Sequence, residues 1–287
     1  MPAAHRGYTP AVPAERIAEN LAYINWTVLA SLAVGGFGAV ALGRLRTSAT
    51  RGYLAFTALC AAAFAVLAYL SDLALPAAIA GSTVHADPSW DVPRRIALLA
   101  TAGIGLVYAL ALAWGRGAPA LAIAGSVTGG AALLAGALGW GAGPIGAAPL
   151  AIQLVVLALA TGGVFASMIL GHWYLVTPRL PEAPLILFSR LLFGIVGLQL
   201  LLFGVWVAAG TGGGGPFSAL TGPWALFVWL RLLVGLVFPL AVSWAAIQTA
   251  RSRSMESATG LLYIDVGSIA AGTILAAGLY FGAGMLV

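Results

Sequence analysis

Eight long apolar stretches, separated by short polar or Gly/Pro-rich breaks, constrain the fold of this chain most strongly. They cover approximately residues 22–43, 52–71, 95–114, 118–140, 151–175, 184–208, 224–248 and 258–286. A helix that crosses a bilayer needs about 20 predominantly apolar residues. Charged residues make up only 7% of the chain, against about 25% in ordinary soluble domains, and the mean hydropathy is +1.02. The sequence therefore predicts an all-α polytopic membrane protein with eight transmembrane helices.

The arginines predict which helix ends face the cytoplasm, since the chain contains no lysine. The loops after the first, third, fifth and seventh stretches carry Arg44, Arg46, Arg51, Arg116, Arg179, Arg251 and Arg253. The loops after the second, fourth and sixth carry Arg94 and Arg95 together with Asp72, Asp87 and Asp91. Basic loops stay in the cytoplasm, so we expect a multi-pass protein of the cell membrane with both termini on the non-cytoplasmic side. The net charge of +5 reflects this bias, and no nucleic-acid partner is expected.

Similar segments near the ends of the fourth and eighth stretches indicate an internal repeat. Residues 135–143 (AGALGWGAG) match residues 276–284 (AAGLYFGAG) at a constant offset, so that Trp140 corresponds to Phe281. The alternative is coincidence, because Ala, Gly and Leu are so common here. Halves with an even number of helices share one orientation and are related by an axis along the membrane normal. We therefore predict a polar tail (1–21) and two parallel four-helix bundles (22–143 and 144–287), a 4+4 repeat.

Small residues spaced by four recur in the fourth and eighth stretches. The pairs are Gly125/Gly129, Gly139/Gly143 and Gly278/Gly282. Such faces let helix backbones approach closely. They predict that these two helices pack inside the protein or against other membrane or peripheral subunits, in addition to the lipid bilayer.

The candidate ligand-binding residues lie in the second half, which departs from the first by an insertion and by added polar side chains. They are His172, Trp173, Tyr174, Arg190, Gln199, Tyr263 and Asp265. We expect them to form a polar pocket near the cytoplasmic side. Asp265 and Arg190 should approach within about 4 Å directly, or through one water or ligand atom, since an unpaired charge in hydrocarbon costs at least about 2.5–3.5 kcal/mol.

Each of these residues also has a simpler interpretation. Arg190 would reach the headgroups without a partner, Asp265 would be protonated or hydrogen-bonded to Ser268 or Thr259, and His172 with its neighbours would belong to an interfacial aromatic belt. Arg231 is expected to reach the outer surface.

The residue inventory argues against a haem or metal cofactor. His172 is the only histidine in or beside an apolar stretch, and Cys60 is the only cysteine. Haem ligation by two facing histidines, iron–sulfur clusters and zinc sites all need more ligands than this. We predict no metal site and no cofactor held covalently or by haem or metal ligands, and a quinone or lipid as ligand. The expected plan is similar in outline to the quinol-interacting subunits of the polysulfide-reductase type, although no motif of that family is found.

Three functional hypotheses follow. The leading one is a non-catalytic membrane subunit of a larger complex that binds a quinone or lipid in the polar pocket of the second bundle. The second is a small-solute or proton-coupled transporter, in which Asp265 and Arg190 form a gate and Pro239 interrupts the seventh helix. The third is a purely structural or assembly subunit.

Overall fold

The structure is a computed structural model, and it describes residues 12–76, 84, 86–116, 119–177 and 180–287. Within those ranges it contains helices and no strand, and eight helices are long and apolar enough to cross a membrane. This confirms the all-α polytopic prediction. The elements are α1 (Pro13–Glu19), α2 (Leu21–Arg46), α3 (Arg51–Leu73), α4 (Asp91–Ala113), α5 (Pro119–Trp140), α6 (Pro144–Val176), α7 (Ala183–Ala208), α8 (Ala225–Leu232), α9 (Phe238–Arg251) and α10 (Met255–Ala283).

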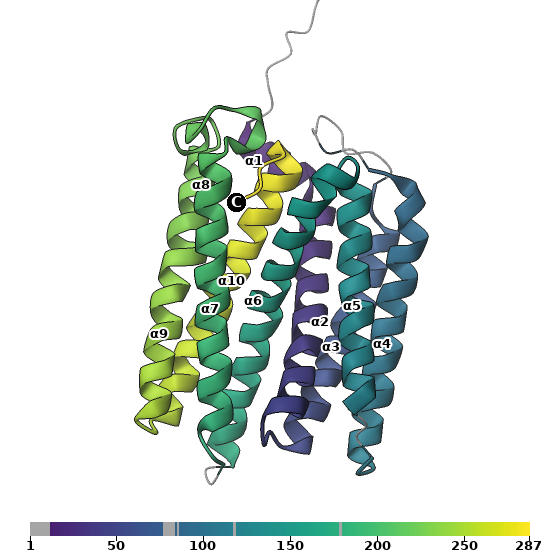
Figure 1. Cartoon of the computed structure of the whole chain (residues 1–287), viewed down its shortest axis with the longest axis vertical. Coiled ribbons are helices and arrows are strands. Elements are labelled where there is room, and N and C mark those ends of the chain that lie inside the picture. The colour runs from purple at the N-terminus through teal and green to yellow at the C-terminus, as the bar shows by residue number, and fades with distance from the viewer. Residues whose placement is uncertain (1–11, 77–83, 85, 117–118, 178–179) are drawn as a thin grey trace, which may run out of the picture.

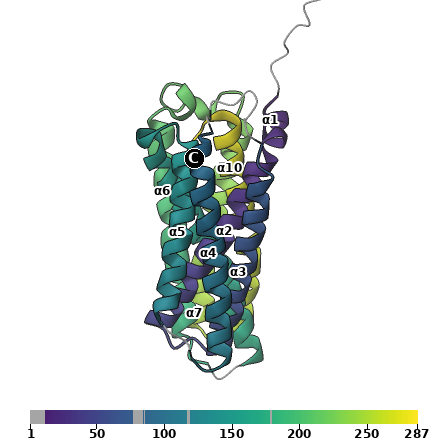
Figure 2. The same ribbon diagram turned by 90° about the vertical axis from the view of Figure 1, so that its right-hand side faces the viewer.

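The helices stand side by side in two groups (Figures 1 and 2). Helix α2 packs against α3 and α5, and α4 packs against α3 and α5, which makes one group. Helix α6 packs against α7 and α10, and α9 packs against the same two helices, which makes the other. Helices α2 and α6 join the groups. The arrangement agrees with a two-bundle plan, whereas the internal repeat and the boundary at residues 143 and 144 stay predictions.

The junction between α2 and α6 is unusually close because glycines face each other across it. A Cβ atom added to Gly162 would lie 2.2 Å from the backbone nitrogen of Gly36 and 2.4 Å from the carbonyl carbon of Gly35. Such distances are far inside van der Waals contact, so only a glycine fits at position 162. Small residues thereby set how closely the two bundles approach, as is common between membrane helices.

The glycine faces of α5 and α10 are also covered from within the chain. Gly125 lies against the ring of Phe37 on α2, while Gly278 lies against Ile17 of α1 and Ile24 of α2. These faces therefore pack inside the protein. These glycines are therefore not available as a contact surface for partner subunits. Whether the protein has such partners stays a prediction.

The seventh transmembrane span is helical throughout but changes its pitch. Between α8 and α9, residues Leu233–Val237 form a π-helical turn, and Pro239 follows directly. At the same level, a Cβ added to Gly235 would lie 2.6 Å from the Cα of Gly272 on α10.

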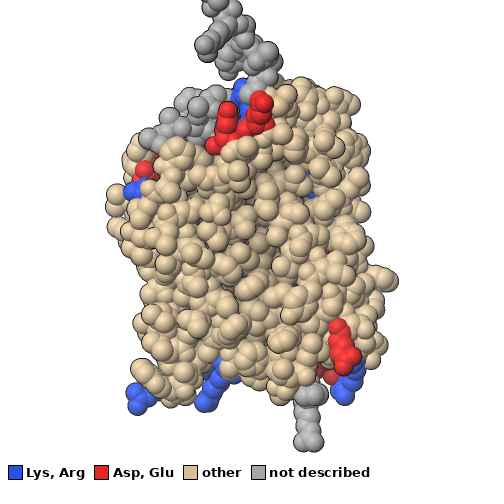
Figure 3. All heavy atoms as spheres, turned by 180° about the vertical axis from the view of Figure 1, so that it is seen from behind, with Lys and Arg blue, Asp and Glu red and all other residues tan. Residues whose placement is uncertain are grey.

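Charged side chains gather at the two ends of the molecule, and the visible band between them is almost free of them (Figure 3). Helix α1 and the C-terminus lie at one end (Figure 1). The last turns of α2 and α9, with Arg44, Arg46 and Arg251, and the loop with Arg116 lie at the other end, which we call the arginine-rich end. Arg179 falls outside the described residues. Which end faces the cytoplasm stays a prediction.

Candidate functional site

The candidate residues of the second bundle do not converge on one pocket. Asp265 is fully buried, but Arg190 is exposed and makes no ion pair with it. The direct contact predicted between the two charges is therefore wrong. The Asp265 carboxyl instead accepts hydrogen bonds from Ser243 Oγ of α9 (2.6 Å) and from Ser268 Oγ (3.4 Å). Hydroxyl donors thus satisfy this carboxyl without a cation.

Gln199 lies with a different charge, Arg231. The Arg231 guanidinium is only 2% exposed, so the expectation that it reaches the surface is wrong. Its Nη2 donates to Gln199 Oε1 (2.7 Å), and its Nη1 donates to the carbonyl of Gly235 (3.2 Å). Its Nε donates to a backbone oxygen of Val287, the last residue of the sequence (3.4 Å). The Gln199 and Gly235 acceptors are neutral, and the three contacts hold the side chain in place.

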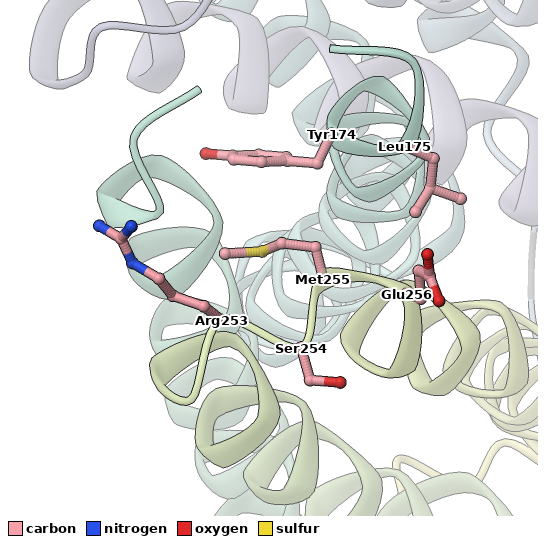
Figure 4. Close-up of a pocket in the computed structure, with 6 residues that line it drawn as sticks. All are labelled: Tyr174, Leu175, Arg253, Ser254, Met255 and Glu256. Atoms are coloured by element: carbon pink, nitrogen blue, oxygen red, sulfur yellow. The ribbon is translucent and has the colours of Figure 1, made fainter. Parts of the chain in front are cut away.

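The remaining candidates lie at the arginine-rich end. His172 and Tyr263 are exposed, and Trp173 packs beside Gly52 of α3. Tyr174 lines a hollow of about 340 Å³ with Arg253 and Met255, and Figure 4 shows these three side chains entering the same space. The Tyr174 hydroxyl donates to the Pro181 carbonyl (2.5 Å), and Arg253 is paired with Glu182 (2.9 Å). Tyr174 and Arg253 are thus already engaged within the chain, whereas the Glu256 carboxylate, which also lines the hollow, makes no hydrogen bond or ion pair with the described residues.

A stronger polar site lies at the opposite end, in the first bundle. Asp72, at the end of α3, is fully buried, and Arg94, in the first turn of α4, is 1% exposed. Arg94 forms a two-point ion pair with Asp72, and its Nη2 also contacts Asp91 Oδ1 (2.9 Å). Arg95 Nε donates to Asp72 Oδ1 (2.7 Å). Two arginines and two aspartates balance in charge, which offsets the cost of burying them.

Aromatic rings surround the Arg94 guanidinium. Its central carbon lies 4.6 Å from the ring centroid of Trp140 and 5.9 Å from that of Trp26. Trp140 packs edge-on against Tyr23 (5.5 Å) and against Phe281 of α10 (5.5 Å). These cation–π contacts add to the ion pair, and they are strongest where water is excluded. The cluster draws the first and last transmembrane helices together at this end.

One nitrogen of this cluster has no acceptor. Arg94 Nη1 is buried, and in the described part of the chain it has no hydrogen-bond partner. A buried donor left without an acceptor costs about 1–3 kcal/mol. The missing acceptor makes this nitrogen the clearest candidate for a contact with a ligand.

Two hollows flank the short 3₁₀ helix Pro88–Trp90, beside this cluster. The first, about 240 Å³, is lined by Arg94, Arg95 and Asp91 together with the Tyr23 and Trp140 rings. The second, about 230 Å³, includes Gly139, from which an added Cβ would lie 3.4 Å from Arg94 Nη1. Ala86 lines both. We call the two together the Arg94 pocket.

The loop that borders the Arg94 pocket is held against α5 by a backbone hydrogen bond. The Asp87 backbone N–H donates to the Gly139 carbonyl (2.8 Å). The Asp87 carboxyl accepts from the Ser89 backbone N–H (3.0 Å), and hydrogen bonds from Ser89 lower the pKa of this carboxyl. Asp87 thus adds a negative charge to the rim of the pocket.

The sequence alone assigns Asp72, Asp91, Arg94 and Arg95 to a loop, and it therefore misses this site. In the structure α3 extends to Leu73 and α4 begins at Asp91, so all four lie in helix ends. One sequence signal could have indicated the site. Asp91 and Arg94 are spaced so that they share one face of a helix, and an acid, Asp72, ends the previous apolar stretch.

No group of three side chains of the metal-binding types lies together among the described residues. Comparisons of the chain with known protein families, curated proteins and solved structures found no match.

Proposed function

We propose that this multi-pass membrane protein binds a quinone, with the ring in the Arg94 pocket and the isoprenoid tail in the bilayer. The observation that carries the proposal is the buried Arg94 Nη1, which has no acceptor among the described residues, beside a hollow lined by aromatic rings. A quinone carbonyl is a neutral acceptor on a flat ring. It would satisfy the free N–H without disturbing the balance of charge between the two arginines and two aspartates.

The pocket also suits an apolar ligand that arrives from lipid. It lies where α3 ends and α4 begins, and its walls combine Leu75 and Pro76 with the Tyr23 and Trp140 rings. Small-molecule sites typically combine a small number of precisely placed polar groups with apolar and aromatic walls. The electrons for any oxidation or reduction of the ring would come from another chain, so this protein acts as a non-catalytic subunit of a larger complex.

Saturable binding of a short-chain ubiquinone to the purified protein in detergent tests the proposal. We expect wild-type protein to bind it, measured by calorimetry and by an increase in melting temperature. Ala86→Phe fills the pocket from a loop position, and we expect it to weaken binding at least tenfold. The matched control is Ala74→Phe, because Ala74 is exposed at the end of α3 and does not line the pocket.

The unliganded melting temperatures of both variants should match that of the wild type, which separates loss of binding from loss of folding. A wild-type protein without saturable binding, or an Ala86→Phe variant that binds like the wild type, would refute the proposal.

The transporter hypothesis has less support. The buried charge beside the π turn, Arg231, already donates to Gln199, Gly235 and Val287, and Asp265 makes no ion pair with Arg190 that could open and close.

A further inference from the structure

A groove runs along the membrane-facing surface between α2 and α7, with α6 as its floor. Figure 1 shows α6 between these two helices. The groove has a volume of about 380 Å³, and small residues such as Gly38, Gly163 and Ser167 line it together with Leu42 and Leu191. It is distinct from the Arg94 pocket in both position and lining residues.

The helix packing explains why the groove exists. Glycines bring α2 and α6 into close contact at Gly35 and Gly162, whereas α7 packs beside α6. A Cβ atom added to Gly163, the next residue after the contact point, would have no other atom within 4 Å. The floor of the groove is therefore open space that a side chain or a ligand can fill.

The interior of the groove is suited to a hydrocarbon chain. Its one hydroxyl-bearing residue, Ser167, donates its hydrogen to the Gly163 carbonyl of its own helix (2.7 Å). The other lining residues are glycine, alanine, leucine, isoleucine and phenylalanine. No lining side chain is thus left to bind a polar group.

A polar hollow follows one helical turn further toward the arginine-rich end. It is lined by Arg46, Thr47 and Ser48 from the end of α2 and by Ala183, Pro184 and Leu187 from the start of α7. Leu187 and Leu191 are four residues apart on α7, as are Leu42 and Arg46 on α2, so both hollows follow the same helix faces. Along these helix faces, the apolar groove is thus followed by a surface that carries a basic side chain and hydroxyl groups.

Two arginines at this end are available for an anion. Arg46 and Arg190 are exposed, and neither makes a hydrogen bond or ion pair with the part of the chain that the structure describes. Arg190 lies three residues after Leu187 on α7, hence on the neighbouring face. Glu182, which precedes the hollow, is already paired with Arg253 (2.9 Å). The local charge is therefore positive.

The groove and the polar hollow together have the length of one lipid leaflet. From Gly35, in the groove, to Arg46, in the polar hollow, α2 rises about 16 Å at 1.5 Å per residue. The hydrocarbon core of a bilayer is about 30 Å thick, so one leaflet takes up about half of this.

From these features we infer that the protein binds one anionic phospholipid of the leaflet at the arginine-rich end. An acyl chain lies in the groove over Gly163, and the phosphate lies beside Arg46 and Arg190.

Native mass spectrometry of the delipidated protein with added phosphatidylglycerol tests this inference, with phosphatidylcholine of the same chains as the neutral probe. We expect one phosphatidylglycerol to remain bound at concentrations where phosphatidylcholine is lost. Arg46→Gln with Arg190→Gln should weaken this binding about 25-fold, at about five-fold for each arginine near an anionic headgroup. Arg116→Gln with Arg251→Gln is the control, since it removes the same charge from the same end.

The variant Gly163→Leu tests whether an acyl chain lies in the groove, because the leucine side chain fills the open space there. We expect it to abolish retention of the single lipid, whereas Gly103→Leu on the lipid-facing side of α4 should not, since Gly103 also has open space around it. Equal retention of both lipids, or unchanged retention in Gly163→Leu or in the Arg46/Arg190 variant, would overturn the inference. Ubiquinone binding at the Arg94 pocket should be unaffected by these variants, so the two proposals fail separately.

Discussion

The two buried arginines of this protein are stabilised in different ways. Arg94 pairs with the carboxylates of Asp72 and Asp91, and its Nη1 has no acceptor among the residues that the structure describes. Arg231 pairs with no aspartate or glutamate in the described part of the chain, and it donates to the Gln199 amide, the Gly235 carbonyl and a backbone oxygen of Val287. The first arrangement suits a binding site, whereas the second suits a structural role.

The structural role of Arg231 follows from Pro239. In an α-helix the carbonyl of Gly235 accepts from the N–H of residue 239, and proline has none. Arg231 Nη1 donates to that carbonyl instead. We expect Arg231→Met to cost more free energy of unfolding in the wild type than in a Pro239→Ala background, where the new amide takes over. The difference should be about 1–3 kcal/mol, the cost of one unsatisfied buried group.

A double-mutant cycle by SDS-titrated unfolding measures this difference. Equal costs of Arg231→Met in the two backgrounds would show that the guanidinium does not compensate for the proline.

At the level of single residues the sequence predicts the burial of Asp265, but not that of Arg231 or Arg94. It identifies Asp265 as an intramembrane acid and offers Ser268 as a partner, which is confirmed, but it cannot identify Ser243 across the helix pair. Partners on other helices depend on the rotation of each helix about its axis. Helices that are apolar all round carry no pattern that sets this rotation.

At the level of elements, glycines at neighbouring positions of α6 have opposite environments. Gly162 faces the backbone of α2 at contact distance, and Gly163 faces the open groove. We expect Gly162→Ala to lower the free energy of unfolding by about 1–3 kcal/mol or more, because backbone atoms cannot move aside without separating the helices. Gly163→Ala should leave stability unchanged or raise it by up to about 1 kcal/mol, since alanine is the better helix former.

SDS-titrated unfolding of the two variants provides the measurement, and each variant serves as the control for the other. Similar losses in both would mean that α2 and α6 do not meet at Gly162.

The number of transmembrane helices is predictable from the sequence, because length and hydropathy alone define them. Helix ends are less so. Hydropathy places the third apolar stretch at 95–114, whereas the helix begins at Asp91, and this one-turn difference moves the Arg94 pocket from a loop into the bundle. Charged residues that are buried by mutual pairing lower the hydropathy without ending the helix, so hydropathy underestimates the length of such helices.

At the level of the whole molecule, an even number of spans places α1 and the C-terminus at the end opposite the arginine-rich loops. Basic loops stay in the cytoplasm. In a Cys60→Ala background, we expect cysteines at Ser48 and Ser252 to react with a membrane-impermeant maleimide only from the cytoplasmic side. A cysteine at Ser89 should react only from the opposite side. The reverse labelling of all three positions would invert the orientation, and labelling of Ser48 and Ser252 from different sides would contradict the fold.

The aromatic cluster at the Arg94 pocket has a consequence for biogenesis. Tyr23, in the first transmembrane helix, contacts both Trp140 and Phe281, and Phe281 lies in the last (ring centroids 5.0 Å from Tyr23). At about 5–20 residues per second, a ribosome makes these two rings roughly 10–50 s apart. Phe281 does not line the pocket, but it packs against Tyr23 and Trp140, which do. A nascent chain that stalls before α10 would therefore be inserted in the membrane with these two rings lacking the support of Phe281.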